Sequence, residues 1–422
     1  MPKLLTAYNQ PEEVQLTFGK GENHRVDETA VPEGYARLAS NVDATPSNTL
    51  VSRPAFSKGL LPGGHSMYTS AAGDTFYVSN HTLVRVLGDS TVPVFDRMGS
   101  AVLFRSTAPL WWTELDGVVF YSNGTDIGSI DRALRWRPVG IPNNAAYNAE
   151  FDADRHVMVV WVDDRGEESG AVQCDRGYGS LVNDGYALRL YVSEKGSGVF
   201  RRVPFDGGGV GATDEEDALL RALALAGAEG APVTTAGLVP LPGCKYLTAF
   251  AGRLFGAVGS TLVYSNALRF GLYDPAYNAL DVPGTITAVG AVSDGLFVGT
   301  DRGMWFLSGT DPDKAELILV SSLPVFADSQ CYVDVSTFPE SVGIAPGLQR
   351  GKLPVWVTPS GVAVGLPTGL VRVPQASAVV IPPLSSPRVA VLDRNGYTQL
   401  VVVVNSTLRE AVGTAVDSLV TN

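Results

Sequence analysis

Residues 246–266 read YLTAFAGRLFGAVGSTLVYSN, and residues 286–320 read ITAVGAVSDGLFVGTDRGMWFLSGTDPDKAELILV. Both segments consist of short apolar runs, in which apolar residues alternate with small or polar ones. This alternation, interrupted by Asp-Gly and Gly-Ser pairs, predicts antiparallel β-hairpins. Gly252 and Gly295 are expected to supply the positive φ that the turns need. They lie 43 residues apart, which matches the period of a four-stranded propeller blade, about 40–50 residues.

The same unit recurs before residue 139, where Gly73 and Gly117 occupy equivalent turns 44 residues apart. The strands predicted there are Ser66–Ser70, Thr75–Ser79, Leu83–Leu87, Thr91–Phe95, Leu110–Thr113, Val118–Ser122, Asp126–Ile130 and Leu134–Pro138. A looser third unit is expected to have strands at His156–Val162, Ala187–Val192 and Gly198–Val203. Two later units are predicted at 354–382 and around the Asn395-Gly396 turn. The repeats predict an all-β chain folded as a β-propeller of about six to seven four-stranded blades.

Residues 206–240 break the β pattern. A Gly-rich opening is followed by Thr213 and Glu216, which have the spacing of a helix capping box, and then by a run of Ala and Leu. Acidic residues in the first turn suit the helix dipole. One short helical insertion is therefore expected here. Residues 327–351 are expected to form either a second insertion or a divergent outer strand.

These features divide the chain into three parts. Residues 1–62 form an N-terminal arm, in which Ala36–Phe56 predicts two strands. These strands, or the C-terminal strand Gln399–Asn405, are candidates for closing the ring of blades. Residues 63–405 form the propeller with its insertions, and residues 406–422 form a C-terminal tail. The arm and the insertion at 206–240 are the segments expected to contact partners, because extensions on a rigid scaffold usually carry such roles.

The composition and motifs predict no site for chemistry. The net charge of −12 argues against a nucleic-acid-binding surface, which would be basic. The three cysteines lie far apart in the sequence, and no histidine has metal-ligand spacing to another histidine or cysteine. The G-x-S-x-G, P-loop and H-E-x-x-H motifs do not occur. The chain is therefore not expected to be an enzyme, and no catalytic, cofactor-binding or metal-binding residue is predicted.

A carbohydrate-binding or glycan-degrading propeller that engages a host surface is the alternative. It would require converging carboxylates, and acidic pairs are present at Asp152/Asp154, Asp163/Asp164, Asp214/Glu215/Glu216 and Asp311/Asp313. The repeated S-x-D-x-G-x-x-W boxes of sialidase-like propellers are absent from the sequence. The acidic pairs are interpreted as solvated loop residues, and the six tryptophans, all in predicted strands, as core residues. A bacterial interaction scaffold is a further rival.

The N-terminal segment has too short an apolar run for a signal peptide, and no apolar run approaches the ~18 residues of a membrane span. We therefore expect a protein that is made and folded in a cytoplasm.

Three motif segments resemble motifs of tail β-propeller proteins of tailed bacteriophages. Residues 40–43 (SNVD) and 50–54 (LVSRP) resemble an N-x-D…R-R-P-G signature that precedes the first blade, although Ser52 and Ala55 depart from it. Residues 252–255 (GRLF) with 262–265 (LVYS) resemble a strand pair of that family. Residues 294–300 (DGLFVGT) and 303–309 (GMWFLSG) resemble its following blade. The resemblance covers about a quarter of the chain, mainly 36–56 and 246–311.

The resemblance implies a structural virion protein, similar to the tail nozzle or hub propellers of short-tailed phages. Such proteins form a homo-oligomeric ring below the head–tail connector and contact other tail or connector proteins. DNA passes through the ring during ejection without sequence-specific binding, and an acidic channel wall would repel its phosphates. The implied location is the virion tail, assembled in the cytoplasm of the host bacterium.

Overall fold

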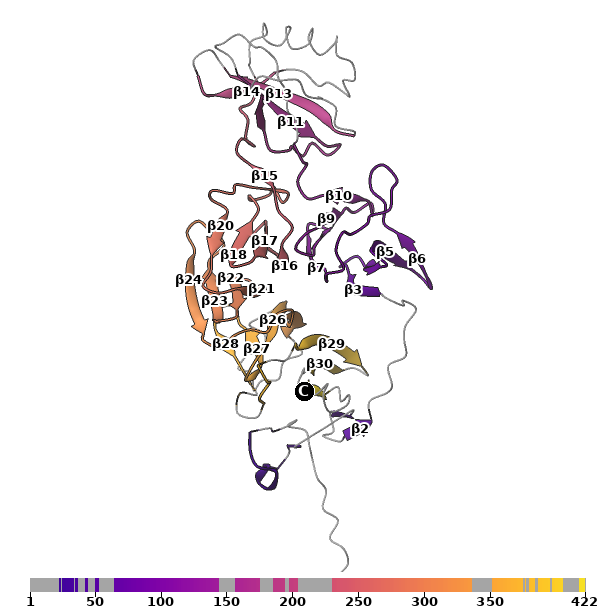
Figure 1. Cartoon of the computed structure of the whole chain (residues 1–422), viewed down its shortest axis with the longest axis vertical. Coiled ribbons are helices and arrows are strands. Elements are labelled where there is room, and N and C mark those ends of the chain that lie inside the picture. The colour runs from indigo at the N-terminus through magenta and orange to yellow at the C-terminus, as the bar shows by residue number, and fades with distance from the viewer. Residues whose placement is uncertain are drawn as a thin grey trace, which may run out of the picture. The chain divides into compact units, whose positions relative to one another are not determined.

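The computed structural model describes residues 23, 25–33, 35–36, 42–44, 50–52, 64–143, 156–174, 185–193, 197–203, 230–335, 351–374, 376, 379–383, 386–394, 397–404 and 417–421. In this part of the chain the secondary structure is almost entirely β (Figure 1). The short 3₁₀ helix η1 (Glu28–Ala30) lies there, and Asp27 caps it by accepting a hydrogen bond from Thr29 N. None of the described helical residues forms a segment that is long and apolar enough to cross a membrane. The Thr213–Glu216 capping box lies outside the described residues.

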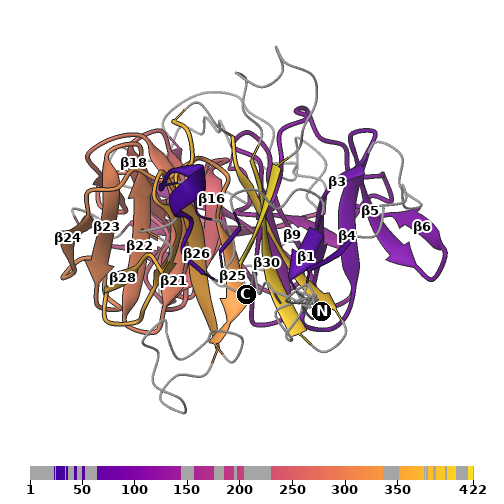
Figure 2. The same cartoon turned by 90° about the horizontal axis from the view of Figure 1, so that it is seen from below.

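Five sheets have four strands in chain order, each antiparallel to its neighbour in the pairings described, so that each sheet is a simple meander. The first contains β3 (Gly64–Thr69), β4 (Thr75–Ser79), β5 (Thr82–Leu87) and β6 (Ser90–Pro93), and the second contains β7 (Trp111–Leu115), β8 (Val118–Ser122), β9 (Ile127–Ile130) and β10 (Trp136–Pro138). The next two contain β16 (Lys245–Phe250), β17 (Arg253–Val258), β18 (Thr261–Tyr264) and β20 (Ala279–Asp281), then β21 (Ile286–Val292), β22 (Gly295–Thr300), β23 (Gly303–Ser308) and β24 (Glu316–Ser321). The fifth contains β25 (Cys331–Asp334), β26 (Lys352–Thr358), β27 (Gly361–Gly365) and β28 (Val371–Arg372). The all-β prediction and the predicted hairpins are confirmed, and Figure 2 shows β22 and β23 side by side.

Three smaller sheets complete the described part. The two strands expected in the N-terminal arm are β1 (Val42–Ala44) and β2 (Leu50–Ser52), which pair with each other. The β15 strand (Val239–Pro240) pairs with β19 (Leu272–Tyr273). A three-stranded sheet contains β29 (Arg388–Arg394), β30 (Tyr397–Val404) and β31 (Asp417–Thr421), so the end of the segment expected to be a tail pairs with a neighbouring strand.

The third sheet does not follow chain order. It consists of β11 (Val157–Val162), β12 (Val172–Cys174), β13 (Ala187–Ser193) and β14 (Phe200–Arg202), arranged as β12-β11-β13-β14. The sequence predicts β11, β13 and β14 but not β12, which is too short to show an alternating pattern. Because β12 occupies one side of β11, β13 must pair on the other side. The third unit is therefore not a meander like the others.

The turn glycines behave differently in the two copies of the repeat. Ala251 and Gly252 have φ values of 47° and 70°, as a primed two-residue hairpin turn requires. Gly295, in contrast, lies inside β22 and has no positive φ, so the expectation for this residue is wrong. Glycine is needed there because an added Cβ would lie 2.4 Å from the carbonyl oxygen of Leu307. The constraint at Gly295 is one of packing, and it comes from the neighbouring strand.

The chain divides into two compact units, one comprising 58–291 with 309–315 and the other comprising 1–57, 292–308 and 316–422. In the first unit, Phe76, Leu83 and Tyr121 belong to a core shared by the first two sheets. A second core joins Phe120 of β8 to Leu254 of β17. Each such buried large side chain contributes roughly 1.5–3 kcal/mol.

In the second unit, Trp356 of β26 packs on Phe297 of β22 at 5.4 Å between ring centroids, and Phe297 lies 4.8 Å from Phe306. All six tryptophans lie in strands, as predicted, and Trp161 and Trp356 are fully buried.

Candidate functional site

A cavity of about 520 Å³ lies beside β10 and the third sheet, within the first compact unit. Six arginines contribute to its walls, namely Arg97, Arg137, Arg165, Arg189, Arg202 and Arg269. We call this space the arginine cleft. The acidic residues in its walls are Asp163, Glu167 and Glu168. In a chain with a net charge of −12, this concentration of guanidinium groups is the clearest candidate for a binding site.

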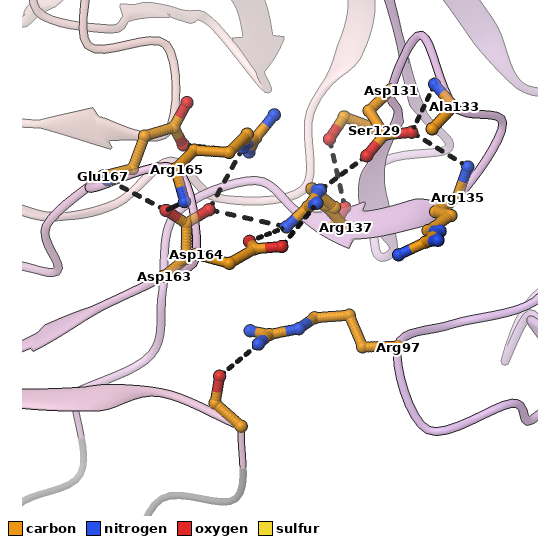
Figure 3. Close-up of polar contacts among 11 residues, drawn as sticks. Arg97, Ser129, Asp131, Ala133, Arg135, Arg137, Asp163, Asp164, Arg165 and Glu167 are labelled. Atoms are coloured by element: carbon orange, nitrogen blue, oxygen red, sulfur yellow. Dashed lines mark hydrogen bonds and ion pairs between the residues drawn. The ribbon is translucent and has the colours of Figure 1, made fainter. Parts of the chain in front are cut away.

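Arg137 lies at the centre of the polar contacts of the cleft (Figure 3). It belongs to β10 and is only 6% exposed. Its Nε donates to Asp131 Oδ2 at 2.7 Å, and its Nη1 and Nη2 donate to the two carboxylate oxygens of Asp164. Asp163 Oδ2 lies 3.7 Å from Nη1. One buried cation is thus surrounded by three carboxylates.

The carboxylates are held in place by their own loops. After β9, Asp131 Oδ1 accepts hydrogen bonds from the backbone N–H groups of Ala133 and Arg135, at 2.9 and 3.0 Å. After β11, Asp163 Oδ1 accepts from the N–H groups of Arg165 and Glu167, both at 2.9 Å. Each aspartate therefore orders a tight turn through one oxygen and faces Arg137 through the other. Arg137 links the second sheet to the third across this pair of turns.

The ionisation of the cluster follows from these contacts. Burial opposes the charge on Asp131, but hydrogen bonds from Arg137 and from the backbone N–H groups of Arg135 and Ala133 outweigh it and lower the pKa of this carboxyl. The hydrogen bonds from Arg137 likewise lower the pKa of Asp164. Hydrogen bonds to Asp164 and Asp131 raise the pKa of Arg137 in turn. All three groups are charged at neutral pH.

Two further arginines of the cleft are also paired with carboxylates. Arg165 contacts Asp163 and Glu167, both at 3.2 Å. Arg189 forms an ion pair with Glu168, which also accepts a hydrogen bond from the Tyr191 hydroxyl at 2.7 Å. These pairs fix the positions of the guanidinium groups along one wall of the cleft.

Arg97 and Arg269 have no carboxylate within ion-pairing distance among the described residues. Arg97 donates through Nη2 to the carbonyl oxygen of Gly185, and its guanidinium lies 4.7 Å from the centre of the Tyr186 ring. Its Nη1 is buried and has no hydrogen-bond partner in the part of the chain that the structure describes. Arg269 donates through Nη2 to Thr234 Oγ1. Guanidinium groups without a paired carboxylate suit an oxyanion ligand.

The structure revises one interpretation of the acidic pairs. Asp163 was expected to be a solvated loop acid, but its side chain is only 5% exposed and faces Arg137, whereas that of Asp164 is 52% exposed. Asp313 accepts a hydrogen bond from the Tyr264 hydroxyl at 3.0 Å, and Asp311 pairs with Lys314. The Asp152/Asp154 and Asp214–Glu216 groups lie outside the described residues. Among the described residues, no group of three His, Cys, Asp or Glu could hold a metal ion.

No site residue is predicted from the sequence, and the cleft does not follow from its motifs. The local signal that could have drawn attention to it is the alternation Arg135-Trp136-Arg137 in a predicted strand, because alternation places both arginines on one face of a sheet. Charged residues on a strand face need partners, but only Asp131 is near Arg137 in the sequence, and Asp163 and Asp164 follow a strand of another sheet. Spacing in the sequence does not reveal them.

Outer strands of two sheets expose apolar side chains. In and after β6, the terminal strand of the first sheet, Val92, Phe95, Met98 and Leu103 are 36–71% exposed. In β24, the terminal strand of its sheet, Ile318 and Leu319 are 45% and 50% exposed. Neighbouring residues of a strand point to opposite faces, so both faces of β24 are apolar and accessible in the isolated chain. We call these two regions the apolar outer strands.

No family model and no curated protein matches this chain. Among solved structures, it is similar to the N-terminal domain of Nup159, with 12% identity over 97% of this chain and 92% of that chain, and a TM-score of 0.30. It is also similar to BBS1N in complex with ARL6DN, with 11% identity over 87% of this chain and 94% of that chain, and a TM-score of 0.30. It is also similar to a mutant Trypanosoma rangeli sialidase, with 14% identity over 86% of this chain and 59% of that chain, and a TM-score of 0.24. Likenesses at this level carry no argument about function.

Proposed function

We propose that the chain is a structural protein of a bacteriophage tail. In this proposal its sheets are the blades of a propeller of about six to seven blades. Several copies form a closed ring, similar to a nozzle or hub, around the channel for DNA ejection, and the ring contacts neighbouring tail or connector proteins. The proposal rests on the resemblance of three motif segments together with the secondary structure in which they lie.

The secondary structure of the motif segments is the observation that carries this proposal. GRLF (252–255) forms a hairpin turn and the start of β17, and LVYS (262–265) covers the end of β18. The segments DGLFVGT (294–300) and GMWFLSG (303–309) cover β22 and β23, which pair residue for residue from Gly295↔Ser308 to Thr300↔Gly303. The motifs thus occupy the same strand pair in two successive meanders. This agreement between motif and strand position supports a repeated blade more strongly than sequence similarity alone.

The N-terminal signature also coincides with a structural element. The described residues of the signature lie in β1 and β2, where Val42 pairs with Ser52 and Asp43 pairs with Val51. A hairpin that precedes the first four-stranded sheet is consistent with the arm that the resemblance implies.

The apolar outer strands support the formation of a ring. A terminal strand with apolar side chains on both faces is a liability in an isolated monomer, because its unpaired edge invites association. Subunits that contact one another through two different surfaces form closed rings when the rotation between them closes. We infer that β6 and β24 with their exposed side chains lie in contacts between subunits or with neighbouring tail proteins.

The glycan alternative has less support. A sugar platform built from tryptophan would need exposed indole rings, yet Trp161 and Trp356 are buried and the other four tryptophans are partly buried in their sheets. Trp112, for example, stacks on Tyr68 at 5.4 Å and donates its indole N–H to the carbonyl of Ser66. These contacts match core packing.

Cryo-EM of tailed virions that contain this chain, located with a labelled antibody, tests the proposal. Density for propellers in a ring on the tail axis is the expected result. Label at the tips of fibres would favour the glycan alternative, and absence of label from all particles would overturn the virion role.

The subunit contacts can be tested separately in solution by mass photometry. Ile318→Asp should reduce oligomer formation, whereas Val258→Asp, at a residue that is equally 45% exposed but in β17, should not. Equal effects of both variants would argue against β24 as a contact surface.

A further inference from the structure

We propose that the arginine cleft binds a small ligand that carries at least two oxyanion groups, phosphate or carboxylate. This inference is independent of the proposed tail function and goes beyond it, because a structural ring needs no small-molecule site. It concerns the first compact unit alone, in which all residues of the cleft lie.

The size of the cleft is the first support. Its volume of about 520 Å³ falls within the ~300–1,000 Å³ of typical ligand sites. Its walls combine guanidinium groups with apolar surface from Phe120, Phe270 and Val139. Such a wall accommodates the body of an organic ligand as well as its charged groups.

The charge balance is the second support. Arg137, Arg165 and Arg189 are paired with carboxylates, whereas Arg97 and Arg269 have none within ion-pairing distance among the described residues. These two guanidinium groups place positive charge in the cleft of a chain with a net charge of −12. A positive recess on an acidic protein concentrates small anions and directs them to one place.

Arg97 provides the most specific evidence. Its guanidinium is held by the Gly185 carbonyl and the Tyr186 ring, yet the buried Nη1 has no partner among the described residues. A buried donor without a partner is costly, and native structures usually satisfy it. A ligand oxygen in the cleft would supply the missing acceptor.

Arg269 provides the second anchoring point. Its Nη2 donates to the neutral Thr234 hydroxyl, which leaves the positive charge without a paired carboxylate in the described part of the chain. Arg137, Arg165 and Arg189 are already paired, so they position the wall and do not need to bind. Two available cations predict a ligand with two or more anionic groups.

Isothermal titration calorimetry of the full chain tests the proposal, with inorganic tripolyphosphate and citrate as probes at low salt. We expect saturable binding of at least one probe. Loss of one charge-assisted contact, in Arg97→Gln or Arg269→Gln, should weaken binding about tenfold or more. Arg302→Gln, an exposed arginine in the other compact unit, is the matched control and should bind like the wild type.

Arg97→Lys and Arg269→Lys are second variants in case the glutamine variants fail to fold. They keep the positive charge and lose only the planar guanidinium group. Circular dichroism and melting curves establish that each variant is folded, and the lysine variants should bind with intermediate affinity. Absence of binding by the folded wild-type chain overturns the proposal. It is also overturned if the cleft variants bind like Arg302→Gln, or if polyglutamate binds and neither small probe does.

Discussion

Replacing Arg137 with methionine should destabilise the junction between the second and third sheets by about 3 kcal/mol. Removing one partner of a buried ion pair typically costs 3–5 kcal/mol, because the remaining charges are left in a poorly solvated place. In this protein the side chains of Asp131 and Asp163 are 10% and 5% exposed. Each keeps two backbone donors, however, and Asp164 is half exposed. The lower end of the range is therefore expected.

The effect should depend on pH in a defined direction. The pKa values of Asp131 and Asp164 are lowered in the folded chain. The stability that these two carboxylates contribute is therefore present at pH values above the pKa of an aspartate in the unfolded chain, about 3.9. It is lost as the pH falls through the lowered values, when the carboxylates become protonated. The difference between wild type and Arg137→Met should be largest near neutral pH and should shrink in acid.

Native-state hydrogen exchange of peptides from β10 and β11 measures the free energy of local opening. A local measurement is needed because a chain with two compact units need not unfold in a single step. Arg165→Met is the control, since Arg165 is 32% exposed and its ion pairs are expected to contribute at most about 1 kcal/mol. The reasoning is refuted if Arg137→Met costs no more than Arg165→Met at pH 7. A difference that is unchanged in acid would refute the electrostatic origin.

Three further outcomes are expected. Gly256→Val should lower the melting temperature markedly, since an added Cβ would lie 2.2 Å from the Cys244 sulfur, whereas Gly198→Ala, with open space around it, should not. The Cys244 thiol is fully buried and its pKa is raised to about 12, so peptide mass spectrometry should find it alkylated only after unfolding. Gly295→Val should yield insoluble or unfolded chain because of its clash with Leu307, and a normally melting variant would contradict the described packing.

Much of the β structure could be predicted because strands and hairpin turns depend on residues that are adjacent in the sequence. Alternation within each strand and glycine at Gly73, Gly117 and Gly252 predict hairpins, and all three glycines have positive φ. Two strands, Thr75–Ser79 and Val118–Ser122, have the predicted bounds. A meander needs only adjacent segments to pair, so local patterns suffice.

The order of strands in the third sheet and the constraint at Gly295 could not be predicted in the same way. The side of β11 on which β13 pairs depends on β12, a three-residue strand without a clear pattern. Gly295 resembles a turn glycine in the sequence, but its requirement comes from Leu307 on the next strand. Both features depend on which backbone lies nearby in three dimensions.

The sequence by itself determines that this is an acidic, turn-rich β chain with a repeated hairpin unit, because composition and periodicity are local properties. Only the tertiary structure brings Arg137 of one sheet to Asp163 and Asp164 of another and places six arginines around one cavity. The partners of a charged side chain are the groups that lie close to it in space, and the free energy of pairing depends on burial. Neither quantity exists until the sheets have packed together.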